Sequence, residues 1–188
     1  MAAASAAAIN PSNILAGDEN NDQQYDLFIS YEWGIKKEVE PFHAKLEAAP
    51  QPLKVWRDNR LQYNNDSLYA QLCRQIKRSR LFLFLLTKAY TQSTMCKKEL
   101  IYAAKLGKTI ICFMIEKMTS DEMGDEIRFI MGNCVYKQYY KNPKSLDPKK
   151  DVRHSNWFND YFDDAKELIL TNLNVFKFIL KISFFQII

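Results

Sequence analysis

Short apolar runs alternate along the chain with longer segments in which apolar residues recur at helical spacing. The runs predict five strands, at residues 25–31, 53–56, 81–86, 109–115 and 134–136. The run at 81–86 is apolar at every position, which is expected of a parallel strand that helices cover on both faces. We therefore expect this run to form a central strand of a sheet.

The segments between these runs predict helices. The first carries Val39, Phe42 and Leu46 on one face and should end before Pro50. The others cover residues 68–78, 90–106, 121–131 and 157–173. Strict alternation of strand and helix requires each strand to return through a helix and to pair in the same direction. The sequence thus predicts one doubly wound α/β domain over residues 25–173.

The two ends differ from this domain. Residues 1–24 are rich in Ala, Asn and Asp, have no periodic apolar face, and are expected to form a disordered leader without the pattern of a secretory signal. Residues 174–188 form an apolar tail, which Lys177 and Lys181 interrupt and which is too short to span a bilayer. We expect a helix there, packed on the domain or a partner, lying on a membrane surface, or exposing apolar side chains to water.

Charge and cysteine content narrow the function classes. The 26 Lys and Arg residues and the 22 Asp and Glu residues are mixed along the chain, which argues against nucleic-acid binding. Cys73, Cys96, Cys112 and Cys134 form no CxxC pair, and the chain has only two histidines, so we expect no metal site. Such cysteines are typical of reduced, buried positions in a cytoplasmic protein.

The loops after the first three strands should hold any site, because open α/β sheets bind ligands at the carboxyl ends of their strands. The first of these loops contains neither a GxGxxG nor a GxxxxGKS phosphate-binding motif. The third strand ends at Leu86 and Thr87, without the aspartate of a phospho-acceptor domain. Rossmann domains, P-loop domains and phospho-acceptor receiver domains are therefore excluded.

Three segments in chain order carry a more specific pattern. They are 25–31 (YDLFISY), 55–61 (VWRDNRL) and 79–100, the last with Ser79-Arg80 before its strand and Tyr90, Ser93, Cys96, Glu99 and Leu100 after it. Together these motifs resemble the Toll/interleukin receptor (TIR) domain family, over residues 25–173. The resemblance implies a flavodoxin-like, five-stranded parallel sheet of order 2-1-3-4-5 with helices on both faces, and a signal-transduction function, with innate immunity as one expected setting.

The resemblance also implies an activity. Many TIR domains cleave NAD between its ribose and nicotinamide, and the glutamate that carries this activity in the family falls on Glu99. NAD would then be a substrate, and no cofactor is expected. A carboxylate near the start of a helix could hold the ribose hydroxyls and oppose the charge of an oxocarbenium ion, while the helix dipole keeps it ionised. Alternatively, Glu99 is an ordinary solvated helix residue.

Other candidate substrate-binding residues lie near the same strand ends. Trp33 could stack on a nucleotide ring or cover the sheet edge. Arg57 and Arg60 could meet a pyrophosphate or be ordinary surface arginines. Ser93 is expected to cap the helix that carries Glu99. Tyr31 and Met95 complete the set, Tyr31 with the alternative of a core or rim aromatic.

Self-association is the remaining expectation. The resemblance implies other TIR domains as partners, including copies of this chain, and an interaction loop containing Asp58, Asn64, Asn65 and Asp66. Asparagine and aspartate stand in this loop where the family often has glycine or proline, and Met95 replaces a common tryptophan. These two departures favour the alternative function, a non-catalytic adaptor that acts only through TIR–TIR interaction.

Overall fold

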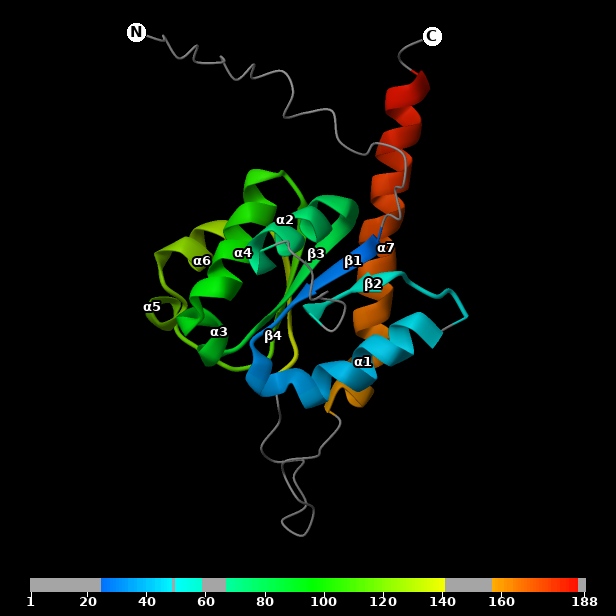
Figure 1. Ribbon diagram of the computed structural model, residues 1–188. Helices are drawn as coiled ribbons and strands as arrows, with labels where there is room; N and C mark the ends of the chain where they lie inside the picture. The colour runs from blue at the N-terminus through cyan, green and yellow to red at the C-terminus, as the bar shows by residue number, and fades with distance from the viewer. Residues whose placement is uncertain (1–24, 49, 59–66, 141–156, 186–188) are drawn as a thin grey trace, which may run out of the picture.

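The computed structural model describes residues 25–48, 50–58, 67–140 and 157–185; between 157 and 185, side chains are described only from Asp160 to Asn174. Five parallel strands form one sheet of order β2-β1-β3-β4-β5 (Figure 1), which confirms the predicted flavodoxin-like fold. The strands are β1 (Tyr25–Ser30), β2 (Val55–Trp56), β3 (Ser79–Leu86), β4 (Thr109–Met114) and β5 (Val135–Gln138). As predicted, the strand that contains residues 81–86 lies in the centre.

Helices cover both faces of this sheet. One face packs against α1 (Lys36–Ala48) and α7 (Trp157–Phe185), and the other against α2 (Leu68–Arg78), α4 (Thr94–Lys105) and α6 (Asp125–Met131). Successive side chains of a strand point to opposite faces, so β3 contributes Leu81, Leu83 and Leu85 to the first core and Phe82, Phe84 and Leu86 to the second. Both faces of β3 are therefore buried, which explains its uninterrupted apolar sequence.

Two predicted helices are each divided in two. The segment predicted as 90–106 consists of α3 (Lys88–Gln92) and α4, because Ser93 between them is extended, with φ −76° and ψ 113°. Residues 121–131 are divided at Gly124, whose φ of 76° ends α5 (Ser120–Met123) before α6 begins. A positive φ is readily adopted by glycine and interrupts a right-handed helix.

The loop after β1 begins with a short 3-10 helix, η2 (Trp33–Ile35), which leads into α1. Helix α1 ends at Ala48, before Pro50 as predicted. Helix α7 runs from Trp157 to Phe185. Among the described residues, no helix combines the length and apolarity needed to cross a membrane.

Candidate functional site

Side chains from three elements meet at the carboxyl edge of the sheet. Ser30 is the last residue of β1, Arg57 and Asp58 follow β2, and Glu99 comes from α4. This is the edge at which an open parallel sheet binds its ligands. One acidic helix residue and the beginnings of two loops thus lie together at this edge.

Glu99 is half-buried and is held by the end of β1. Its Oε2 accepts a hydrogen bond of 2.6 Å from Ser30 Oγ. Ser30 Oγ also lies 3.0 Å from the hydroxyl of Tyr90, which donates to the carbonyl of Cys96 at 3.2 Å. Glu99 is therefore oriented by the buried hydroxyl of Ser30 and is not one more solvated glutamate of a helix surface.

The direction of Glu99 follows from how α4 is anchored. Ser93 is the N-cap of α4, as predicted, and its Oγ accepts a hydrogen bond from the Cys96 amide at 3.3 Å. Cys96, Leu100 and Ala103 are buried and fix the face of α4 that packs on the sheet. Glu99 lies three residues after Cys96 and four before Ala103, so it shares this face.

Burial raises the pKa of Glu99 to about 7, with a smaller upward contribution from the Asp58 carboxylate, while the Ser30 hydrogen bond lowers it. The expectation that the helix dipole keeps Glu99 fully ionised was wrong in this respect. The dipole acts mainly within the first turn, whereas α4 begins at Thr94 and Glu99 lies beyond that turn. Desolvation therefore dominates, and near neutral pH both protonation states are populated.

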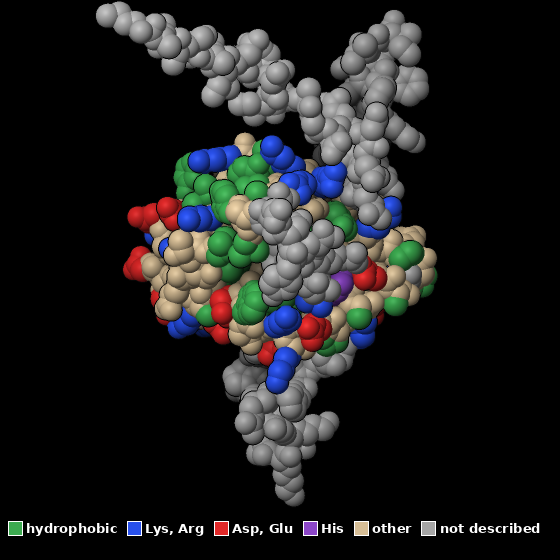
Figure 2. All heavy atoms as spheres, viewed as in Figure 1, with side chains coloured by type: hydrophobic (Ala, Val, Ile, Leu, Met, Phe, Trp, Pro, Cys, Tyr) green, Lys and Arg blue, Asp and Glu red, His purple; other side chains and the backbone are tan. Residues whose placement is uncertain are grey.

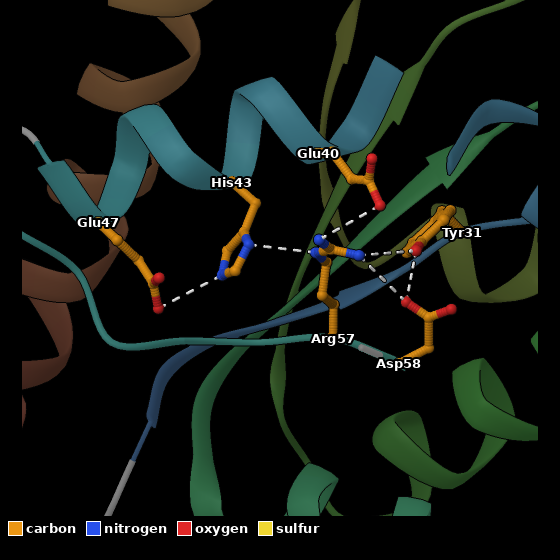
Figure 3. Close-up of polar contacts among 6 residues, drawn as sticks. All are labelled: Tyr31, Glu40, His43, Glu47, Arg57 and Asp58. Atoms are coloured by element: carbon orange, nitrogen blue, oxygen red, sulfur yellow. Dashed lines mark hydrogen bonds and ion pairs between the residues drawn. The ribbon is translucent and has the colours of Figure 1, made fainter. Parts of the chain in front are cut away.

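Arg57 is buried, at 5% exposure, and lies at the centre of a polar network (Figure 3). Its Nε donates to His43 Nδ1 at 3.1 Å and its Nη1 to the Tyr31 hydroxyl at 3.3 Å. Asp58 lies 3.5 Å from its guanidinium and Glu40 3.8 Å. Arg57 is consequently not an ordinary surface arginine, because its donors already face partners from the loop after β1, from α1 and from the second loop.

The same network fixes Asp58 and Tyr31 next to the strand ends. The Tyr31 hydroxyl donates a short hydrogen bond to Asp58 Oδ1. Burial, reinforced by Asp58, raises the pKa of Tyr31 far above its usual range, so Tyr31 remains a neutral donor. Tyr31 is 5% exposed, in agreement with its interpretation as a core aromatic. Asp58 is 14% exposed and contributes a negative charge near Glu99.

The remaining candidates differ in exposure. Trp33 is 66% exposed, and Lys36 Nζ lies 5.1 Å from the centre of its ring. At this exposure its ring covers little of the sheet edge and is open to solvent. Met95 is exposed in the first turn of α4. Arg60, Asn64, Asn65 and Asp66 lie outside the described residues.

Two residues of the site had no predicted role. Ser30 is a hydroxyl at the end of an otherwise apolar strand, and that position was the available signal. His43 lies on the buried face of α1 with Val39, Phe42 and Leu46, and its Nε2 lies 3.3 Å from Glu47. A polar residue on such a face needs a buried partner, but the sequence does not identify the partner as Arg57.

Burial keeps the Cys96 and Cys134 thiols in their neutral form. All four are free thiols; Cys96 and Cys112 are buried, whereas Cys73 and Cys134 are only half-buried. Burial raises the pKa of Cys96 to about 12 and that of Cys134 to about 11. Thiols with such pKa values are poor nucleophiles at neutral pH.

Comparisons with known proteins agree with this architecture. Residues 27–145 match the family model described as the TIR domain. The TIR domain of the Toll-related receptor TRR-2 from Hydra magnipapillata is similar in structure, with 18% identity and a TM-score of 0.51, over 74% of this chain and 98% of that chain. The TIR domains of the activated Roq1 resistosome show 16% identity and a TM-score of 0.46, over 81% of this chain and 85% of that chain. No curated protein matches significantly in sequence.

Proposed function

This chain belongs to the TIR domain family of signal-transduction modules, and from that premise we propose that it hydrolyses NAD to nicotinamide and ADP-ribose products, with Glu99 as the catalytic carboxylate. We propose further that it works in the cytoplasm and in contact with other TIR domains, including its own copies. The observation that carries the catalytic proposal is the Ser30–Glu99 hydrogen bond of 2.6 Å at the carboxyl edge of the sheet.

The reaction asks for an anionic group beside the ribose. When the bond between ribose C1′ and the nicotinamide nitrogen breaks, both of its electrons go to the nitrogen, and the cationic ring leaves as neutral nicotinamide. Water then adds to C1′ and releases a proton. Little proton donation to the leaving group is needed, but the ribose acquires positive charge in the transition state. A fixed carboxylate stabilises that charge and can accept hydrogen bonds from the ribose hydroxyls.

We assign different roles to the surrounding residues. The exposed ring of Trp33 is the candidate for stacking on a base of the substrate, and Met95 and Arg60 remain candidate contacts. Arg57 and Tyr31 are positioning residues that hold the Asp58 carboxylate in place near Glu99. Their polar atoms contact each other and Asp58, and so are already engaged within the protein. Ser93 acts as the helix cap that orients Glu99.

The deciding experiment measures nicotinamide release from NAD by the purified full chain. Release should be detected, and it should rise more than linearly with protein concentration if copies complete one another's sites. The measurement is repeated with a crowding agent, which favours association. Absence of release at every concentration, with and without the crowding agent, would overturn the enzymatic proposal and leave the non-catalytic adaptor as the function.

The activity is expected to depend on pH through Glu99. Because the ionised carboxylate is the active form and its pKa is about 7, kcat/KM should fall about tenfold for each pH unit below that value. Replacing Ser30 with alanine removes the hydrogen bond that lowers this pKa, so the midpoint should move to higher pH. Replacing Asp58 with asparagine removes a nearby negative charge, so the midpoint should move to lower pH.

These two shifts of opposite sign identify the titrating group. The measurement is the pH profile of kcat/KM for the wild-type chain and both variants, with circular dichroism to confirm that each remains folded. A flat profile between pH 5 and pH 8, or equal midpoints in all three proteins, would mean that another group controls the rate.

A further inference from the structure

A pocket of about 580 Å³ lies between α4 and α6, on residues that the proposed catalytic site does not use. Its lining is mostly apolar and comes from neighbouring turns of the two helices. The lining includes Ile101, Ala104 and Lys105 of α4 and Glu126, Phe129 and Ile130 of α6. A pocket of this size could accommodate a large apolar side chain.

Phe129 lies at the edge of this pocket and, at 79%, is the most exposed large apolar side chain among the described residues. An exposed aromatic ring beside an apolar hollow is typical of an interaction surface, in which such rings act as anchors. Here the projection and the hollow lie on the same face of one molecule. A second copy of this face would therefore offer a hollow to this projection and a projection to this hollow.

The charges around the pocket are also self-complementary. Lys105 is an exposed residue of α4, and Glu126 is an exposed residue of α6 across the pocket. Neither forms an ion pair with another described residue, whereas Asp125 is paired with Arg128 at 2.6 Å. In a two-fold interface, residue i of one copy meets residue j of the other and the reverse. One basic and one acidic residue on opposite sides of the pocket satisfy this requirement.

The wider surface has the same character. Figure 2 shows hydrophobic side chains gathered on the side of the molecule where Figure 1 places α2, α4 and α6, with basic side chains along one border and acidic side chains along another. Leu68, Tyr69 and Leu106 are among the exposed large apolar residues that belong to this side or its rim. Apolar residues with a charged border are the usual composition of a protein–protein interface.

We propose that the α4–α6 face binds the same face of a second copy in a two-fold dimer, in which Phe129 enters the partner's pocket and Lys105 pairs with the partner's Glu126. The residues of this surface are different from those of the second loop, through which self-association was expected. The inference goes beyond the proposed NAD cleavage, because it requires neither Glu99 nor a substrate.

Sedimentation velocity of the full chain over a range of concentrations tests the proposal. The wild-type chain should pass from monomer to dimer as concentration rises. Phe129→Glu should raise the dissociation constant at least about a hundredfold, because it places a charge in the pocket twice per dimer. Since Phe129 is solvent-exposed, this variant should remain folded, which circular dichroism checks.

Charge reversal at Lys105 and Glu126 provides a more specific test of the proposed dimer. Lys105→Glu and Glu126→Lys should each weaken the dimer about tenfold, and the double variant should recover most of the lost affinity. Lys54→Glu and Glu167→Lys are matched controls, because both residues are exposed and lie away from this face; they should have no effect.

A monomer at all concentrations, a dimer that Phe129→Glu leaves intact, or a double charge variant no tighter than its parents would overturn the proposal. Oligomers larger than a dimer that form equally well in Phe129→Glu would also overturn the proposal. They would indicate that the chain self-associates through the second loop. Nicotinamide release is measured in the same samples. A chain that dimerises as described but never cleaves NAD would refute the enzymatic proposal alone.

Discussion

Replacing Glu99 with glutamine should reduce nicotinamide release about a hundredfold to a thousandfold, the usual cost of removing one preorganised charge-stabilising group. Glutamine has nearly the same shape and can still accept the hydrogen bond from Ser30, so the local geometry should be preserved. What it lacks is the negative charge that opposes the developing charge on the ribose. The loss should therefore appear in kcat as well as in kcat/KM.

The same substitution should make the folded chain more stable at pH 8. Burial raises the pKa of Glu99 from 4.5 in the unfolded chain to about 7 in the folded state. Between these values the folded state holds a proton that the unfolded state has released, so the free energy of unfolding falls as the pH rises through this window. Above it, ionised Glu99 costs at most about 3 kcal/mol. Glutamine avoids this cost, so the gain should be largest at pH 8 and small at pH 5.

Urea denaturation of both proteins at pH 5 and pH 8 measures this difference. Glu167→Gln is the matched control, because Glu167 is an exposed residue of α7 and its replacement should change neither activity nor stability. Full activity in Glu99→Gln would show that another residue carries the reaction. An equal stability of Glu99→Gln and wild type at both pH values would contradict the buried, proton-sensitive environment.

Replacing Arg57 with methionine should lower the free energy of unfolding by about 2–4 kcal/mol, because it removes one partner of a buried polar network. His43 and Asp58 would each lose a buried partner, at 3.1 Å and 3.5 Å from the guanidinium. Glu40 contributes little, because its side chain is 49% exposed and water can replace the lost contact. The effect therefore reflects uncompensated buried groups more than lost surface attraction.

Two further variants give this prediction its controls. Arg57→Lys should recover only part of the stability, because an ammonium group lacks the planar fork that reaches His43 and Tyr31 at once. Arg128→Met removes a surface arginine paired with Asp125 and should cost less than about 0.5 kcal/mol. If Arg57→Met and Arg128→Met had the same free energy of unfolding in chemical denaturation, the Arg57 network would contribute nothing to stability.

The central strands could be predicted because their apolar sequences reflect their burial. The uninterrupted apolar run of β3 indicates burial on both faces, and the strand order that the family resemblance implied is confirmed. Periodicity did not reveal the interruptions at Ser93 and Gly124, because apolar residues continue at helical spacing on both sides of them. These interruptions depend on local backbone conformation, which a serine cap and a glycine permit.

The site could be predicted only in part, for a different reason. The resemblance to a family pointed to Glu99, but its hydrogen-bond partner Ser30 lies 69 residues earlier in the chain. The contact between Arg57 and His43 likewise joins a loop to the inner face of α1. Contacts of this kind are created by the packing of elements, and no periodicity within one segment encodes them. The role of Glu99 in NAD cleavage stays a prediction.

Helix α4 carries both Glu99 and Ile101, which are two positions apart and so lie about 200° apart around the helix axis. One side of this rod faces the carboxyl edge of the sheet, and the other lines the pocket beside α6. If a second copy bound at the pocket rotated α4 about its axis, the Glu99 carboxylate on the opposite side of the helix would change direction. Dimer formation and NAD cleavage would then both depend on the orientation of α4. A substitution in α4 that changed one of them would also change the other.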